Sequence, residues 1–174
     1  MPVDITPYVS QLSGELDDHA YKASDSLGRI GSEDVVTAMI ELLHHPNPES
    51  RILAARTLGL VQNNQHGLEP LLAAIKSKDN RSIAGELMMA MEGFDVSDVY
   101  VELFRLYLFG SYKVSLLAKE QLDFSEFNIT SRVIKKAEKH WKHYINNARH
   151  DEVFEIRRAE VETMLGDLKQ FVDS

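Results

Sequence analysis

Apolar residues along this chain recur at intervals of three and four positions, the spacing that places side chains on one face of an α-helix. The clearest stretch is 33–44, whose apolar face consists of Val36, Met39, Ile40 and Leu43. No segment of useful length alternates apolar and polar residues in the manner of a β-strand. The pattern therefore predicts an all-helical chain.

The same spacing predicts two sets of helices that alternate along the chain, and one further helix at each end of it. The first set is expected near residues 19–30, 48–62, 80–93 and 111–122, and the second near 33–44, 66–76, 97–109 and 129–146. A short leading helix is expected with Thr6 as its N-cap and Pro7 as its first residue, and a last amphipathic helix is expected at about 151–172. Ser32 and Asn47 stand directly before predicted helices and are residue types that cap helix N-termini. Each helix of the first set is expected to pair with the next helix of the second.

The first set of helices carries a repeated motif in which alanine is followed four residues later by leucine or methionine. The pairs are Ala23 and Leu27, Ala54 and Leu58, Ala84 and Met88, and Ala118 and Leu122. The alanines are 30 to 34 residues apart, a period typical of solenoids built from helical hairpins. Gly28 and Gly59 directly follow the repeated leucine, where glycine costs a helix about 1 kcal/mol relative to alanine. We therefore expect a neighbouring helix to approach closely at both glycines.

Two segments, AYKASDSLGRIGSEDVVTAMIELL and PESRILAARTLGLVQNNQHGLEPLLAAI, resemble the short HEAT-like repeats also called phycobilisome-lyase-type repeats. The resemblance rests on an arginine and paired small residues ahead of Leu-Gly in the first helix of a pair. The residues that carry it are Arg51, Ala54, Ala55, Leu58 and Gly59, with a weaker copy at Arg81, Ala84 and Gly85. It covers residues 19–94, weakens through 95–146 and does not include the last helix. The resemblance implies a right-handed α-α superhelix of the HEAT or armadillo type.

The resemblance also implies a choice of functions, because relatives of this type are protein-binding scaffolds, phycobilin-lyase accessory factors, DNA-alkylation glycosylases or metal-dependent hydroxylases. The hydroxylase relatives repeat a His-Glu dipeptide, which this sequence lacks. The glycosylase relatives need a basic concave surface, whereas the repeats here are rich in acidic residues. These are Glu33, Asp34, Glu41, Glu69, Glu86, Glu92 and Asp98. No compact motif tests the bilin-lyase alternative, which stays open.

The overall charge narrows the choice of partners. A formal net charge of -8 repels phosphate backbones, so a nucleic-acid role would require a local basic surface. The chain contains no cysteine, which excludes disulfides and thiolate chemistry and is consistent with a reducing compartment. Its start, MPVDITPYVSQ, has neither a basic nor an apolar signal region, and no apolar run approaches the length of a membrane span. A soluble cytoplasmic protein is expected.

Candidate catalytic and metal sites find little support in the sequence. No Gly-rich phosphate loop and no Gly-x-Ser-x-Gly elbow is present. His44 and His45 end a predicted helix, where imidazole groups interact favourably with the free carbonyls. His140 and His143 share one helix side near His150, but their spacing brings together only two of the three or four ligands that zinc needs. We therefore expect no catalytic residues, no bound metal and no cofactor.

The segment VYVELFRLYLFGSY at 99–112 is apolar around nearly the whole circumference of a helix. Such a helix requires cover on every side, which the neighbouring repeats and the last helix would provide. In a second interpretation, Tyr100, Phe104 and Tyr107 leave an aromatic patch that anchors a partner helix or peptide. The sequence leaves both interpretations open, and these three residues are candidate partner-binding residues.

The segment RVIKKAEKHWKHYINNAR at 132–149 reverses the charge of the chain locally. Its cations are Arg132, Lys135, Lys136, Lys139, Lys142 and Arg149, against the single acid Glu138. Its apolar residues Ile134, Ala137, Trp141, Ile145 and Ala148 form an opposite face. The basic face is either a solvated surface or a surface for an acidic protein, an anionic surface or RNA. Lys135, Lys139, Lys142 and Trp141 are its candidate binding residues.

Together these patterns predict a single HEAT-like repeat domain over residues 1–174. Its parts are an N-terminal cap at 1–18, about four helix pairs at 19–146 and a C-terminal capping helix at 147–174. The predicted function is a non-catalytic scaffold or adaptor that binds a protein partner through its inner, second helices. The alternatives are a nucleic-acid-binding or base-processing protein of the glycosylase type and a bilin-lyase-like accessory factor.

The predicted repeat phase can be tested at Ala54. Replacing Ala54 with leucine is expected to overpack the helix pair and to lower the free energy of unfolding by about 1–3 kcal/mol. Urea denaturation followed by circular dichroism measures the change. An unaltered midpoint would mean that Ala54 faces solvent and that the repeat phase is misassigned.

Overall fold

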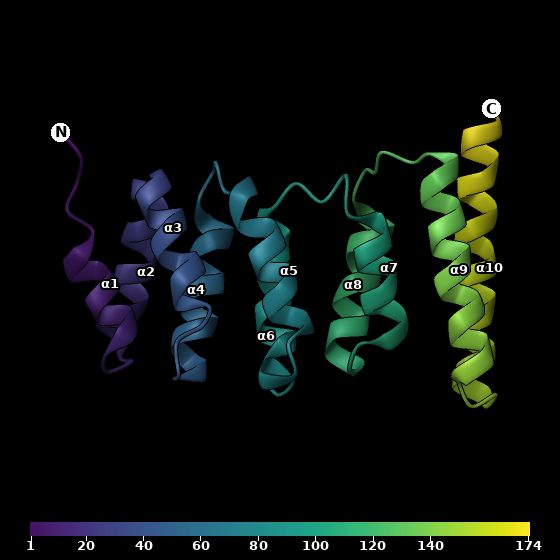
Figure 1. Cartoon of the computed structure of the whole chain (residues 1–174), viewed down its shortest axis with the longest axis horizontal. Coiled ribbons are helices and arrows are strands. Elements are labelled where there is room, and N and C mark those ends of the chain that lie inside the picture. The colour runs from purple at the N-terminus through teal and green to yellow at the C-terminus, as the bar shows by residue number, and fades with distance from the viewer. The chain divides into compact units, whose positions relative to one another are not determined.

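A computed structural model describes residues 1–174 and contains ten α-helices, three short 3₁₀ turns and no strand (Figure 1). The α-helices are α1 (Thr6–Ser13), α2 (Asp18–Ile30), α3 (Glu33–Leu42), α4 (Pro48–Leu60), α5 (Leu68–Lys76), α6 (Ala84–Met89), α7 (Tyr100–Phe109), α8 (Tyr112–Phe124), α9 (Ser131–Asn147) and α10 (Glu152–Asp173). The 3₁₀ turns are η1 (Gln65–Gly67), η2 (Lys78–Asn80) and η3 (Ala90–Gly93). The predicted all-helical fold is confirmed. No helix combines the length and the apolar composition needed to cross a membrane.

Most predicted helices lie within a few residues of their expected ends, and the exception is the helix expected over 80–93. There the chain forms η2, a turn, the short helix α6 and then η3. Asn80 accounts for the late start of α6. Its side-chain amide donates to the carbonyl of Ala74 at 2.9 Å, and its own carbonyl accepts from the N–H of Ile83 at 3.0 Å. These bonds close a turn after α5, so the next helix begins only at Ala84.

Two of the predicted helix caps are present, and one is not. The Ser32 hydroxyl accepts from the N–H of Val35 at 3.4 Å, and the Asn47 side chain accepts from the N–H of Glu49 at 3.0 Å. Thr6 does not cap the leading helix, because it is the first residue of α1. Instead its N–H donates to the carboxylate of Asp4 at 3.0 Å. The N-cap position of α1 is therefore Ile5, whose side chain makes no capping bond.

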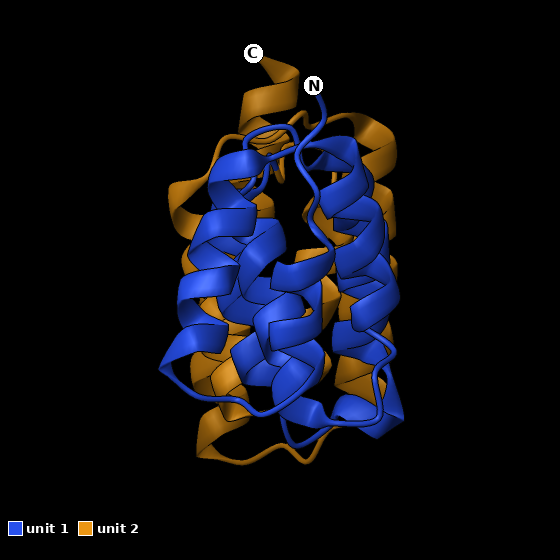
Figure 2. Cartoon of the chain, turned by 90° about the vertical axis from the view of Figure 1, so that its left-hand side faces the viewer, with its two compact units in different colours: residues 1–95 blue, residues 96–174 orange.

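The chain divides into two compact units, residues 1–95 and residues 96–174, which Figure 2 shows in blue and orange. In unit 1, α2, α4 and the α6–η3 segment pack side by side as one layer. Helices α1, α3 and α5 pack mainly on α2, α4 and α6 respectively. In unit 2, α7 packs on α8 and α9, and α10 packs on α9. The predicted division into terminal caps and repeats stays a prediction.

The packing pairs in unit 1 are offset by one helix from the predicted pairs. The sequence pairs α2 with α3 and α4 with α5, whereas α3 lies mainly against α4, and α5 mainly against α6. The spacing of apolar residues shows which face of a helix is buried. It does not show which of two neighbours buries that face, and this is why the pattern did not determine the pairing.

The close approach expected at the two repeated glycines is confirmed. A Cβ atom placed on Gly28 would lie 2.7 Å from the Cβ of Leu60, and one on Gly59 would lie 2.9 Å from the carbonyl oxygen of Ala90. The four repeated alanines, Ala23, Ala54, Ala84 and Ala118, are all buried. The repeat motif thus marks the contacts between helices, as its period predicts.

Polar groups link the helices of this layer. Inside the contact between α2 and α4, the hydroxyls of Ser24 and Thr57 lie 2.8 Å apart. Arg56 donates to the Ser24 hydroxyl at 2.7 Å. Further along, the side-chain amide of Asn64 donates to the carbonyls of Leu58 and Gly93, at 2.8 and 2.9 Å. The side chains of Ser24, Thr57 and Asn64 therefore all have hydrogen-bond partners within unit 1.

A matched pair of glycine substitutions tests the close approach. Gly59→Ala is expected to lower the free energy of unfolding by about 1–3 kcal/mol, because its methyl group meets the backbone of Ala90. Gly166→Ala in α10 has no atom within 4 Å of the new methyl group. It is expected to raise that free energy by about 0.5–1 kcal/mol through helix propensity. Urea denaturation of both variants checks the two signs, and equal effects would contradict the packing at Gly59.

Candidate interaction surface

The three aromatic residues predicted to bind a partner lie in the core of unit 2. Tyr100, Phe104 and Tyr107 have exposed fractions of 4%, 0% and 3%. The ring of Tyr100 lies with its centroid 5.1 Å from that of Phe127. The hydroxyl of Tyr107 donates to the carboxylate of Glu160 on α10. Burial and this carboxylate raise the pKa of Tyr107. All three rings are therefore covered by neighbouring parts of unit 2, and none presents an exposed face to a partner.

The cations of α9 form a continuous exposed surface, which we call the α9 basic face. It consists of Arg132, Lys135, Lys136, Lys139 and Lys142. None of the five forms an ion pair. The buried side of the same helix consists of Ile134, Ala137 and Trp141, and Trp141 is 9% exposed. The predicted amphipathic helix is present, with Trp141 on its core side and the lysines on its solvent side.

Glu138, the single acid of α9, does not neutralise this face, because Glu138 is paired with Lys169 of α10. The Nζ atom of Lys169 lies 2.5 Å from a carboxylate oxygen of Glu138. Both side chains are partly exposed, so the pair contributes little to stability. Its electrostatic effect is nevertheless clear, since it leaves five cations on α9 with no acidic partner.

Phe109, at the end of α7, is the exposed aromatic residue beside the basic face. Its side chain is 49% exposed, and its ring centroid lies 5.8 Å from that of His143 and 5.7 Å from that of Tyr144. His143 follows Lys139 by one helical turn on α9, so the apolar ring borders the cations. The sequence analysis did not single out Phe109. The signal for it was the spacing of four between Arg105 and Phe109, which places both on the solvent side of α7.

The histidines near this surface are separated rather than gathered. His150 stacks on Phe154 at a centroid distance of 4.0 Å, away from His143, which packs on Phe109. Burial, together with the guanidinium of Arg105, lowers the pKa of His140 below its ordinary value. The lowered pKa favours the neutral form of His140 at pH 7. No group of three or more histidine, aspartate or glutamate side chains is arranged to hold a metal ion.

Arg157 of α10 forms a polar anchor that joins the helices beneath this surface. One terminal nitrogen of Arg157, on α10, donates to the carbonyl of Leu108 and to the hydroxyl of Tyr144, each at 3.1 Å. The other donates to the hydroxyl of Ser115 at 3.0 Å. The guanidinium also lies 4.9 Å from the ring centroid of Tyr107. One side chain of α10 thus contacts groups on α7, α8 and α9.

The aromatic rings at the α9–α10 turn stack face to face. The ring of Tyr144 lies nearly parallel to those of Trp141 and Phe154, at centroid distances of 5.6 and 6.1 Å. Trp141 and Phe154 are themselves nearly parallel at 6.1 Å. These rings pack together where α9 meets α10, and Trp141 and Phe154 are buried there.

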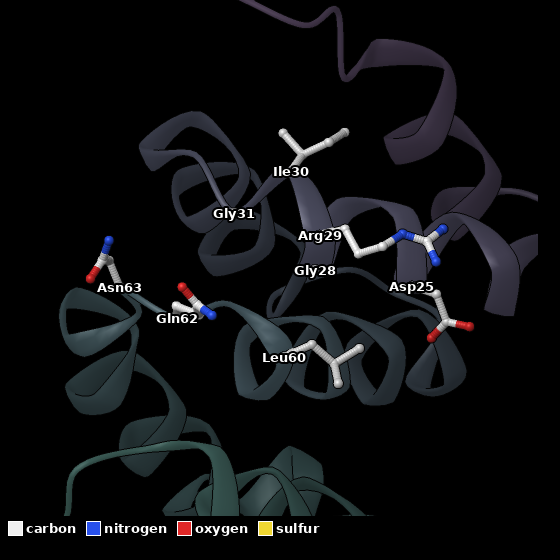
Figure 3. A pocket seen from close by; sticks show the side chains of 8 residues that line it. All are labelled: Asp25, Gly28, Arg29, Ile30, Gly31, Leu60, Gln62 and Asn63. Carbon is white, nitrogen blue, oxygen red and sulfur yellow. The ribbon is translucent and has the colours of Figure 1, made fainter.

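Unit 1 contains an open pocket of about 660 Å³ between the end of α2 and the end of α4 (Figure 3). Asp25 and Arg29 lie on one side of it, and Gln62 and Asn63 on the other. The carboxylate of Asp25 is already paired with the guanidinium of Arg56 at 2.7 Å. The pocket therefore presents amides and one arginine, without a free acid or a nucleophile for chemistry.

Comparison with known proteins assigns a family to residues of unit 1 and to none of unit 2. A family model described as HEAT repeats matches residues 5–92, which is half of the chain. No curated protein matches the chain. The matched residues end before α7, so the α9 basic face and Phe109 lie outside them.

Two neighbouring arginines test the polar anchor. Arg157→Met is expected to lower the free energy of unfolding by about 1–3 kcal/mol, because it leaves three acceptors without their donor. Arg158→Met removes only half-exposed pairs with Glu155 and Glu162 and is expected to cost less than about 1 kcal/mol. Thermal and urea denaturation compare them. Equal costs would show that the Arg157 bonds do not hold α10.

Proposed function

This chain belongs to the HEAT-repeat family, and on that basis we propose that it is a non-catalytic scaffold that binds a protein partner. HEAT repeats commonly serve as protein-interaction scaffolds, because stacked helix pairs present long continuous surfaces. The surface proposed for binding is the solvent side of α7 and α9, which carries the α9 basic face and Phe109. We propose a cytoplasmic location, which the absence of cysteine supports.

The observation that carries this proposal is the combination of unpaired charge and an exposed ring on one rigid face. Five cations without acidic partners adjoin a phenylalanine that is 49% exposed. Interface centres are enriched in aromatic residues, and a patch of one charge beside them steers and orients a partner of the opposite charge. Helices rather than loops hold these groups, which favours a preset recognition surface.

A nucleic-acid partner is the second candidate, because phosphates also bind clustered lysines. The net charge of -8 counts against it, since long-range repulsion opposes the approach of a polyanion. The predicted bilin-lyase role rests on no particular feature of the structure and stays a prediction.

Photo-crosslinking tests the protein-binding role and its location together. Benzoylphenylalanine is placed at Phe109 and, as a matched control, at Tyr21 of α2, whose exposed fraction of 52% is similar. In cell lysate, position 109 is expected to give defined protein adducts that survive nuclease treatment, identified by mass spectrometry. Position 21 is expected to give none of these adducts.

Three outcomes of this experiment decide between the candidates. Protein adducts confined to position 109 support a partner on α7 and α9. Adducts that disappear with nuclease identify nucleic acid as the partner. Adducts at both positions alike, or at neither, contradict the proposed surface.

A further inference from the structure

The α9 basic face is a regular row of charges, and its geometry limits what fits it. Its cations recur at every helical turn, at intervals of three and four residues from Arg132 to Lys142. At 1.5 Å per residue this row is about 15 Å long, with about 5.4 Å between successive turns. Carboxylates on one side of another α-helix repeat with the same period. A helix lying along α9 can therefore bring one acid to each turn of cations.

Phe109 adds an apolar position at the end of this row. His143, one turn after Lys139, contacts the Phe109 ring, so the row of cations ends against an apolar surface. The ring is partly exposed and contacts the rings of His143 and Tyr144. A partner helix that places its acidic residues along the row of cations would contact the Phe109 ring at the end of that row.

We propose that the α9 basic face and Phe109 bind an acidic amphipathic helix of a protein partner, whose carboxylates face the lysines and whose apolar residue packs on Phe109. This inference rests on the proposed function and specifies the chemistry of the partner. Charge complementarity supports it, because the five cations have no acidic partner within the chain. The carboxylates of a partner would pair with these cations, which are now in contact with solvent alone.

The arrangement of the rings disfavours single-stranded nucleic acid as the occupant. Such ligands stack successive bases on open aromatic faces. Tyr144 has Trp141 and Phe154 stacked on it, and Trp141 is 9% exposed. The exposed rings that border the cations are Phe109 and His143, which lie against each other at an angle of 53°. These two tilted rings do not form a row on which successive bases could stack.

Fluorescence anisotropy with the full-length protein and three defined probes tests the inference. The first probe is a labelled helical peptide of about 16 residues with glutamate every three and four positions and one leucine after the last glutamate. The second replaces each glutamate with glutamine, and the third is an oligouridylate of equal charge. The acidic peptide is expected to bind at least about tenfold more tightly than either other probe, and to weaken as salt rises from about 0.05 to about 0.5 M.

A pair of triple variants controls for net charge. Lys135→Glu, Lys139→Glu and Lys142→Glu together are expected to weaken binding of the acidic peptide at least about tenfold. The control changes Lys22, Lys78 and Arg81, all exposed in unit 1, to glutamate and so alters the net charge equally. It is expected to change binding less than about threefold. Far-ultraviolet circular dichroism checks that both variants fold, as expected for unpaired surface lysines.

The results separate this inference from the proposed function. Equal binding of the glutamate and glutamine peptides, or equal losses in the two triple variants, overturns the acidic-helix inference. Tighter, α9-dependent binding of oligouridylate overturns it in favour of nucleic acid. If position 109 crosslinks to a protein while the acidic peptide fails to bind, the protein-binding function stands and only the chemistry assigned to the partner falls.

Discussion

Helices α2 and α4 lie so close together that Leu60 occupies the place of a side chain on Gly28, and the same constraint recurs between Gly59 and Ala90. Most of unit 1 depends on this approach. Because the backbones are close, polar groups trapped between them need partners inside the protein, and Ser24 and Thr57 provide these for each other. The layer formed in this way is the support on which α3 and α5 pack.

Unit 2 packs around α7. This helix lies against α8 and α9, and its Phe104 is fully buried. Polar bonds then join the helices around it. The Ser115 hydroxyl donates to the carbonyl of Tyr107 at 2.6 Å and in turn accepts from Arg157. The family model matches residues 5–92 and so ends within unit 1, before this network of bonds.

The sequence predicted most of the helices, because apolar spacing and capping residues are local signals. It failed where a side-chain hydrogen bond set the start of a helix, as the bond from Asn80 to the carbonyl of Ala74 does in delaying α6. It also left the role of Tyr107 open, since only the fold shows that α10 covers it. Phe109 was missed for a related reason. In a helix that is apolar nearly all round, the spacing of four from Arg105 was the one sequence signal that Phe109 lies on the solvent side. How α9 crosses α7 then decides how much of the ring stays exposed.

The bond from Arg157 to the carbonyl of Leu108 lies one residue before Phe109 and fixes the last turn of α7. Helix ends ordinarily fray, and a ring on a frayed turn loses conformational entropy when a partner immobilises it. Here that loss has already occurred during folding, because α10 holds the turn. The exposed ring of Phe109 is therefore preorganised. A smaller share of the free energy gained from its contacts with a partner is lost in ordering it.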